Sequence, residues 1–323
     1  MNKILEEKFT GPLAWRADTP LPNDGFSVLN AKCQDEIAAV ARELRDNPLP
    51  IEALRPGDFD MQACNALMAG VRDTVDSGTG LTVIGRLDVA GMGEEISTKI
   101  YWLLMSMMGR PVAQKWRGTL IYDVQDTGAR MAPGSVVRSS KTNSGTGFHN
   151  DNSCNLPPDF VALLCLQTAK QGGISGIVSF ESVYNQMLDE HREVLPRLYE
   201  PFFFDRVKEH APGDEILSVK PIFEIDGRHL HVNFSPGLVE LGYLRRGEEM
   251  DREGRVAFDA LCKTTDAEVF CKAFEFQRGQ IQVLNNRRLG HRRTAFRDWD
   301  DSARKRHLVR LWIRDSGRPF YQG

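Results

Sequence analysis

The sequence lacks several features that would place it in a class at once. No run approaches the roughly 18 apolar residues that a membrane-spanning helix needs. Neither charge dominates, with 41 Lys+Arg against 44 Asp+Glu, so nothing indicates a surface for nucleic acid. The first eight residues already include two glutamates and lack the apolar segment of a secretory signal. We therefore expect a cytoplasmic protein whose partner is neither a membrane nor a nucleic acid, and we make no prediction of its oligomeric state.

Paired cysteines are also missing. None of the six cysteines stands in a CxxC pair, so we expect reduced thiols and no zinc ribbon. A chain of 323 residues can bury a large core without disulfides or a structural metal. No linker, repeat or low-complexity tract divides it. We expect one domain over residues 1–323, with a helical buttress in 1–77 and the main core in 78–323.

Hydrophobic periodicity predicts a mixed fold that is richer in strands after residue 118. The expected helices are residues 34–47, 58–76, 94–108, 182–198 and 254–274. The expected strands are residues 81–84, 119–124, 160–166, 177–180, 202–204, 222–225, 229–233, 280–284 and 307–313. Few strand–helix–strand repeats are present, which argues against a doubly wound parallel sheet. The pattern favours a β-rich α+β fold with a double-stranded β-helix (jelly-roll, cupin-like) core and flanking helices.

One short segment carries the main chemical signal. On an extended backbone, side chains at i and i+2 point the same way, so His149 and Asp151 project together. His291, which follows an expected strand, is the best candidate for a third ligand. Two imidazoles and one carboxylate form the facial triad of non-haem Fe(II) oxygenases, which leaves coordination positions open. A lone HxD pair is common by chance, so this assignment needs context.

Other readings remain open from the residues alone. His229 and His231 form a rival i, i+2 pair, but the side chain nearest on their face is Asn233, a poor iron ligand. The same triad with zinc would suit a cupin-like isomerase or hydrolase that uses no 2-oxoglutarate. A non-catalytic metabolite-binding module and a scaffold protein are further alternatives, although neither needs His, Asp and Arg to converge on one cavity.

At several motifs the sequence resembles the TauD/TfdA family of Fe(II)- and 2-oxoglutarate-dependent dioxygenases, in particular its clavaminate-synthase-like branch. The resemblance runs in order over roughly residues 78–316, and the first 75 residues contribute little to it. The matching segments are 147–151 (GFHND), 157–164 (PPDFVALL), 169–175 (AKQGGIS), 201–206 (PFFFDR), 285–296 (NNRRLGHRRTAF) and 306–312 (RHLVRLW).

The resemblance implies roles for individual residues. His149, Asp151 and His291 are expected to hold Fe(II). Arg306 matches the arginine that receives the distal carboxylate of 2-oxoglutarate, which a guanidinium fork suits. Ser175 stands where many relatives have threonine, and its hydroxyl is a weaker candidate for the same carboxylate. Arg310 lies four residues after Arg306 and therefore on the same strand face. In some relatives this position meets an acidic group of the substrate, while an ion pair with a structural acid would explain it equally well.

The expected reaction is oxidation of a C–H bond with O2 and 2-oxoglutarate as co-substrates and release of succinate and CO2. Hydroxylation is the first choice, and desaturation or cyclisation follow from the same chemistry. Halogenases of this superfamily replace the carboxylate ligand by Ala or Gly, so Asp151 argues against halogenation. Arg310 and Asn152 suggest a small polar or anionic, amino-acid-like substrate. The glycine- and serine-rich residues 125–147 are the expected lid over the site.

Overall fold

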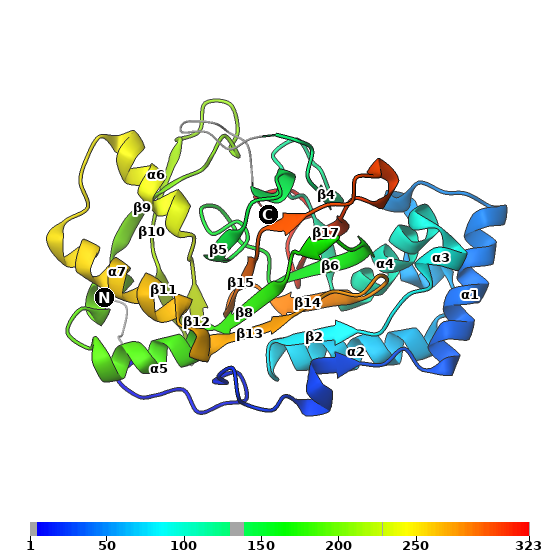
Figure 1. Ribbon diagram of the computed structural model, residues 1–323, viewed down its shortest axis with the longest axis horizontal. Coiled ribbons are helices and arrows are strands. Elements are labelled where there is room, and N and C mark those ends of the chain that lie inside the picture. Colours follow the sequence, from blue (N-terminus) through cyan, green and yellow to red (C-terminus); the bar gives the residue numbers. More distant parts are fainter. Residues whose placement is uncertain (1–4, 130–138, 228, 323) are drawn as a thin grey trace.

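The computed structural model describes residues 5–129, 139–227 and 229–322 (Figure 1). Its helices are α1 (Ala31–Asp46), α2 (Gln62–Asp76), α3 (Val89–Met92), α4 (Glu94–Met108), α5 (Phe180–Glu190), α6 (Pro236–Arg246) and α7 (Arg252–Asp266). Helices α1–α4 gather at one end of the molecule and α5–α7 at the other, with the strands between them. Within the described residues, no helix combines the length and apolar character needed to cross a bilayer.

The larger wall of the core is a seven-stranded sheet in the order β1-β2-β14-β6-β17-β3, with β4 also paired to β17. Its strands are β1 (Phe26–Ser27), β2 (Leu81–Ile84), β3 (Arg110–Val112), β4 (Tyr122–Val124), β6 (Phe160–Gln167), β14 (Ile281–Asn285) and β17 (His307–Arg314). Strand β6 is apolar almost throughout because the sheet is covered on both faces. The helices α1, α2 and α4 pack on the outer face through one continuous apolar cluster.

The smaller wall is a four-stranded sheet in the order β13-β8-β15-β5. Its strands are β5 (Thr146–His149), β8 (Ser175–Ser179), β13 (Cys271–Phe274) and β15 (Leu289–Arg293). Ile177 and Leu289 from this sheet pack with Val161 and Trp312 from the larger one, so the two sheets face each other. Helices α5 and α7 cover the outside of the smaller sheet. This is the predicted β-rich α+β architecture with a jelly-roll core and flanking helices.

Three further antiparallel pairs complete the described strands. They are β7 (Gln171–Gly172) with β16 (Phe296–Arg297), β9 (Pro201–Asp205) with β10 (Leu217–Pro221), and β11 (Phe223–Asp226) with β12 (His229–Val232).

Several expected boundaries were wrong. The helix expected over 182–198 begins at Phe180 and ends at Glu190, and residues Leu195–Tyr199 form a separate 3-10 turn with Pro196 near its start. The helix expected over 254–274 ends at Asp266, and its last part is the strand β13, which pairs with β8. The helix expected from residue 58 begins at Gln62, and the strand expected from 119 begins at Tyr122.

Candidate metal centre

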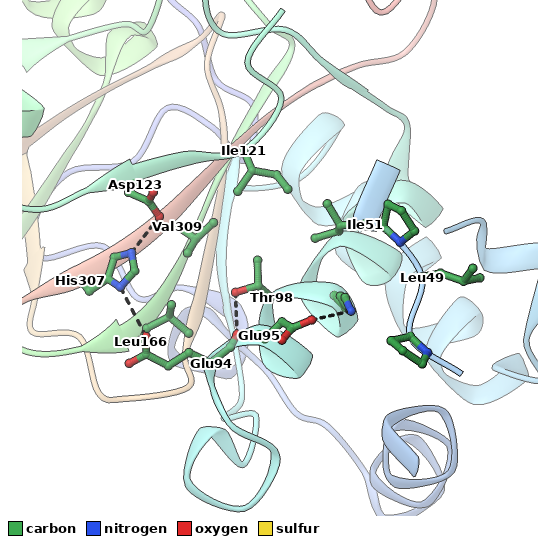
Figure 2. Close-up of a pocket in the computed structure, with 13 residues that line it drawn as sticks. Leu49, Ile51, Glu94, Glu95, Thr98, Ile121, Asp123, Leu166, His307 and Val309 are labelled. Carbon is green, nitrogen blue, oxygen red and sulfur yellow. Dashed lines mark hydrogen bonds and ion pairs between the residues drawn. The ribbon is translucent and has the colours of Figure 1, made fainter. Parts of the chain in front are cut away.

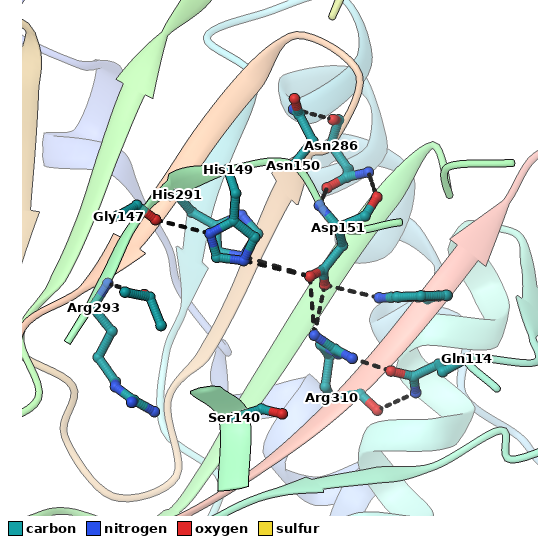
Figure 3. Close-up of polar contacts among 12 residues, drawn as sticks. Gln114, Ser140, Gly147, His149, Asn150, Asp151, Asn286, His291, Arg293 and Arg310 are labelled. Atoms are coloured by element: carbon teal, nitrogen blue, oxygen red, sulfur yellow. Dashed lines mark hydrogen bonds and ion pairs between the residues drawn. The ribbon is translucent and has the colours of Figure 1, made fainter. Parts of the chain in front are cut away.

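The smaller sheet presents two histidines on adjacent strands. His149 ends β5 and is the direct register partner of His291 on β15, so the two imidazole rings lie 4.4 Å apart between centroids. Asp151 follows in the turn after β5. The Nε2 atoms of His149 and His291 lie 3.8 and 3.9 Å from Asp151 Oδ1 (Figure 3). Among the described residues this is the one group of three that could hold a metal ion.

The protonation of both rings suits metal binding. His149 Nδ1 lies 3.0 Å from the Gly147 carbonyl oxygen, which only accepts hydrogen bonds, so Nδ1 carries the proton and Nε2 keeps its lone pair. Burial and the neighbouring His149 lower the pKa of His291 to about 3, so its ring is neutral near pH 7. The three donors therefore fit a divalent iron with two imidazole nitrogens and one carboxylate oxygen.

Asp151 is held in place by several donors. Arg310 Nη1 lies 3.0 Å from both carboxylate oxygens, and the Trp312 indole N–H donates to Oδ2 at 2.8 Å. Burial alone would raise the pKa of Asp151, but Arg310, the two histidines and Trp312 outweigh it and lower that pKa to about 2. Arg310 is fixed in turn by Gln114, whose Oε1 accepts from Arg310 Nε at 2.8 Å.

The backbone around Asp151 is fixed as tightly as its side chain. Asn286 accepts from the Asp151 N–H at 2.8 Å and donates to the Asp151 carbonyl at 3.0 Å. Asn150, on the other side of the turn, donates to the carbonyls of Asn286 and Leu289. Buried amides of this kind position the ligand without touching a metal.

A cavity of about 370 Å³ opens beside the triad and holds the other predicted site residues. Arg306 lines it with only 5% of its surface exposed, and its Nη1 has no hydrogen-bond partner among the described residues. Burial lowers the pKa of Arg306 to about 10, which is still far above neutrality. The Arg306 side chain is therefore a buried cation near pH 7, and an anionic ligand would stabilise it. A carboxylate of 2-oxoglutarate fits this donor.

The remaining predicted residues are placed as follows. Ser175 lines the same cavity, and its hydroxyl bonds Gln282 Oε1 at 3.0 Å, while Gln282 Nε2 is buried and has no partner in residues 5–129, 139–227 and 229–322. Arg310 also lines the cavity, but its ion pair is with Asp151 itself. Asn152 borders the cavity, yet its amide donates to the Leu156 carbonyl at 2.7 Å, so a substrate contact for Asn152 remains a prediction.

The rival histidines lie elsewhere. His231 Nδ1 is 3.0 Å from Arg287 Nη2, and neither His229 nor His231 joins the metal-binding group found in the described residues. The expected lid, residues 125–147, includes residues 130–138, which lie outside the described part of the chain. Ser140 and Thr146, on the far side of that gap, do line the cavity.

Sequence reasoning missed Gln114, Asn286 and Trp312. A signal was available for Trp312, because it stands two residues after Arg310 and therefore on the same face of β17. Asn286 and Gln114 gave no signal, since nothing in their local sequence marks a buried amide that bonds a residue more than 130 positions away.

The chain is similar to known proteins over most of its length. Residues 47–312 match the family model described as taurine catabolism dioxygenase TauD, TfdA family. The chain is 26% identical over 325 residues to FR-33289 synthase of Streptomyces rubellomurinus, which covers 99% of this chain and 94% of that protein. It is 28% identical over 318 residues to the taurine hydroxylase-like protein SAT17 of Stachybotrys chartarum, which covers 95% of this chain and 80% of that protein.

Solved structures share the fold. A structure of asparagine oxygenase (AsnO) superposes with a TM-score of 0.69 and 19% identity, covering 90% of this chain and 93% of that one. The non-haem iron oxygenase OrfP with Fe and α-ketoglutaric acid gives a TM-score of 0.61 and 18% identity, covering 90% and 94%. The match of the family model to most of the chain, together with the grouped triad, shows that this protein belongs to the TauD/TfdA family and is a non-haem Fe(II)- and 2-oxoglutarate-dependent oxygenase.

Proposed function

We propose that this oxygenase hydroxylates a C–H bond of a small polar or anionic, amino-acid-like metabolite, with release of succinate and CO2. The observation that carries the proposal is a buried Arg306 N–H, without a partner in the described part of the chain, in the cavity that also contains His149, Asp151 and His291. A cavity of about 370 Å³ suits a small metabolite together with the co-substrate.

Different residues that line the cavity would have different roles in the reaction. His149, Asp151 and His291 would hold the iron, which when bound supplies the activation of O2. Arg306 would receive the distal carboxylate of 2-oxoglutarate, with Ser175 beside it. Their place on the cavity wall orients the co-substrate toward the triad.

The substrate side of the cavity mixes cations with apolar surface. Arg310 uses Nε and Nη1 to bind Gln114 and Asp151, which leaves Nη2 for an acidic group of the substrate. Leu238, Leu241 and Phe276 supply the apolar part of the lining. This mixture favours a short carbon chain that carries a charged group.

The names of the relatives support the same class. One structure similar to this fold holds asparagine oxygenase with 3-hydroxyasparagine and succinate, and another holds OrfP with (3S)-hydroxy-L-Arg. A curated relative is called taurine hydroxylase-like. These compounds are small, polar and carry an acidic group, which is the chemistry that Arg310 favours.

The test is a succinate assay. Purified protein with Fe(II), ascorbate and 2-oxoglutarate is offered a panel of amino acids and of sulfonate or phosphonate analogues. Mass spectrometry measures succinate and a substrate gain of one oxygen. We expect stimulated succinate release with at least one anionic compound and none with Zn(II). Turnover of a compound with Zn(II) and without 2-oxoglutarate would instead support the isomerase or hydrolase alternative.

A further inference from the structure

The segment after β17 folds back onto the turn that carries Asp151. Arg314, buried at the end of β17, donates from Nη1 to the Phe320 carbonyl and from Nη2 to the Tyr321 carbonyl, each at 3.0 Å. The same Nη2 also donates to the Leu156 carbonyl at 3.0 Å, so one guanidinium joins the C-terminal segment to the turn. We call residues 315–321 the C-terminal strap.

Tyr321 is the residue of the strap that lies closest to the metal ligands in the bonding network. It is 3% exposed, and its hydroxyl donates to Asn152 Oδ1 at 2.8 Å while accepting from Asn155 Nδ2 at 2.8 Å. Its ring stacks on Trp312, with centroids 6.4 Å apart and 25° between the planes. Trp312 is the residue whose N–H binds the Asp151 carboxylate.

Two series of contacts, which we call routes, therefore connect Tyr321 to the metal ligand Asp151. The first runs through the hydroxyl to Asn152, the residue that follows Asp151. Asn152 has φ of +58°, a left-handed conformation that asparagine tolerates when its side chain is bonded locally. The second runs through the ring to Trp312 and so to the Asp151 carboxylate. Both routes fix the direction in which Asp151 presents its oxygen to His149 and His291.

We propose that Tyr321 is a positioning residue of the metal centre and that the C-terminal strap is part of the iron site. The proposal rests on the iron-binding role proposed above for His149, Asp151 and His291. The matched family model ends at residue 312, so Tyr321 lies beyond the part of the chain that the family match covers. Without the strap contacts, the turn that carries Asp151 is less ordered in the metal-free protein. Part of the binding free energy of the ion then goes into ordering this turn, so the affinity for the ion falls.

The direct test is Tyr321→Phe, which removes only the hydroxyl. The readouts are the anaerobic Fe(II) dissociation constant, the visible absorption of the Co(II)-substituted protein, and the melting temperature without metal. Groups that orient metal ligands from outside the coordination sphere contribute about 10- to 100-fold in affinity, and we expect the lower end, about tenfold. The matched control is Tyr199→Phe. The Tyr199 hydroxyl donates to Tyr184 at 2.7 Å in the apolar cluster that packs α5 and α7 on the smaller sheet.

The result that overturns the proposal is an Fe(II) affinity of Tyr321→Phe equal to that of Tyr199→Phe and of the unmodified protein. A lowered melting temperature with unchanged affinity has the same meaning, because the strap would then be structural only. If Tyr321→Phe does not fold, Asn152→Gly replaces it. That variant removes the acceptor of the Tyr321 hydroxyl and keeps a residue at ease with positive φ, and about the same loss of affinity is expected.

A second pair of variants tests the bond between Trp312 and Asp151, on which the ring route depends. Trp312→Phe removes the indole N–H that bonds Asp151, and Trp15→Phe removes an equally buried indole that donates to the Thr79 carbonyl at 2.8 Å. We expect a shifted Co(II) spectrum and weaker Fe(II) binding for Trp312→Phe alone. Failure of the unmodified protein to bind Fe(II) would contradict the proposed function. Normal Fe(II) binding that is insensitive to Tyr321 would contradict only the role of the strap, whatever the result for Trp312→Phe.

Discussion

The two faces of β17 look into two different cavities. Arg306, which precedes the strand, and Leu308 and Arg310 face the cavity beside the triad. His307 and Val309 face a second cavity between the larger sheet and α4, shown in Figure 2, which is larger at about 650 Å³. The alternation predicted from the even spacing of Arg306 and Arg310 is therefore present in the structure, even with a register shift at His307.

The polar groups of the second cavity satisfy one another. His307 Nε2 lies 2.9 Å from Asp123 Oδ1, and its Nδ1 lies 3.7 Å from Glu94. Lys99, also on its wall, pairs with Glu95 at 2.7 Å. In the first cavity, by contrast, Arg306 keeps a buried N–H without a partner in the part of the chain that the structure describes. Of these two cavities, the smaller one is therefore the better candidate for the functional site, because a buried polar group without a partner is explained by a ligand.

The largest expected difference between residues on the two faces of β17 is in their effect on Fe(II) binding. We expect His291→Ala to weaken Fe(II) binding by more than about 100-fold, because a ligand contributes more than the groups that orient it. His307→Ala, on the opposite face, leaves Fe(II) binding unchanged. Anaerobic isothermal titration calorimetry measures both. Comparable losses in the two variants would remove the distinction between the cavities.

The next effect concerns the co-substrate. Arg306→Gln removes the guanidinium that faces the cavity, and a hydrogen bond to a charged group contributes about 1.5–3 kcal/mol. We therefore expect the KM for 2-oxoglutarate to rise by about 10- to 100-fold. Steady-state succinate formation provides the measurement, with His307→Gln as the neighbouring control. An unchanged KM in Arg306→Gln would assign the co-substrate to another residue.

Replacing Arg306 and replacing Arg310 are expected to change the stability of the metal-free protein differently. Arg306→Leu removes a buried cation that has no carboxylate partner, so we expect stability to be unchanged or to rise. Arg310→Leu leaves Asp151 as a buried anion without its cation and is expected to cost about 3 kcal/mol. Urea unfolding at pH 7 compares the two. A larger loss in Arg306→Leu than in Arg310→Leu would contradict the pairing described for this face.

The smallest effect belongs to the second cavity. The hydrogen bond from His307 lowers the pKa of Asp123, so the Asp123 carboxylate stabilises the fold above its ordinary pKa of 3.8. This contribution is lost as the pH falls through the lowered value. Asp123→Asn is therefore expected to reduce the melting temperature slightly at pH 7, and the difference should shrink by pH 3. Differential scanning fluorimetry follows it, and a difference that grows with acidity would have the wrong sign.

The parts of the fold that the sequence predicted well are those with strong local signals. The strand Leu81–Ile84 and the helix Glu94–Met108 have the expected limits. The hydrophobic pattern of each element ends at a glycine. Glycines flank Leu81–Ile84 on both sides, and α4 lies between Gly93 and Gly109. The triad was also predicted, although part of the reasoning was wrong: β5 ends at His149 and Asp151 lies in the turn that follows, so a turn and not the strand period brings these two side chains together.

The errors share a physical cause. Cys271–Phe274 is a strand because it pairs with β8, and α6 forms where Pro236 opens a helix that packs on β9. Neither partner is near in the sequence. The strap is the same case, since Tyr321 meets Asn152 across 169 positions. Contacts between residues so far apart in the sequence form only when the core assembles, so no periodic pattern in the sequence predicts them.

The most direct test of the central claim is an anaerobic titration of the metal-free protein with Fe(II) and 2-oxoglutarate, followed by the weak visible charge-transfer band of the complex. The account predicts the band in the unmodified protein and in His307→Ala and His229→Ala. It predicts loss of the band in His149→Ala and a weakened response to 2-oxoglutarate in Arg306→Ala. A band that persists unchanged in His149→Ala would contradict the account.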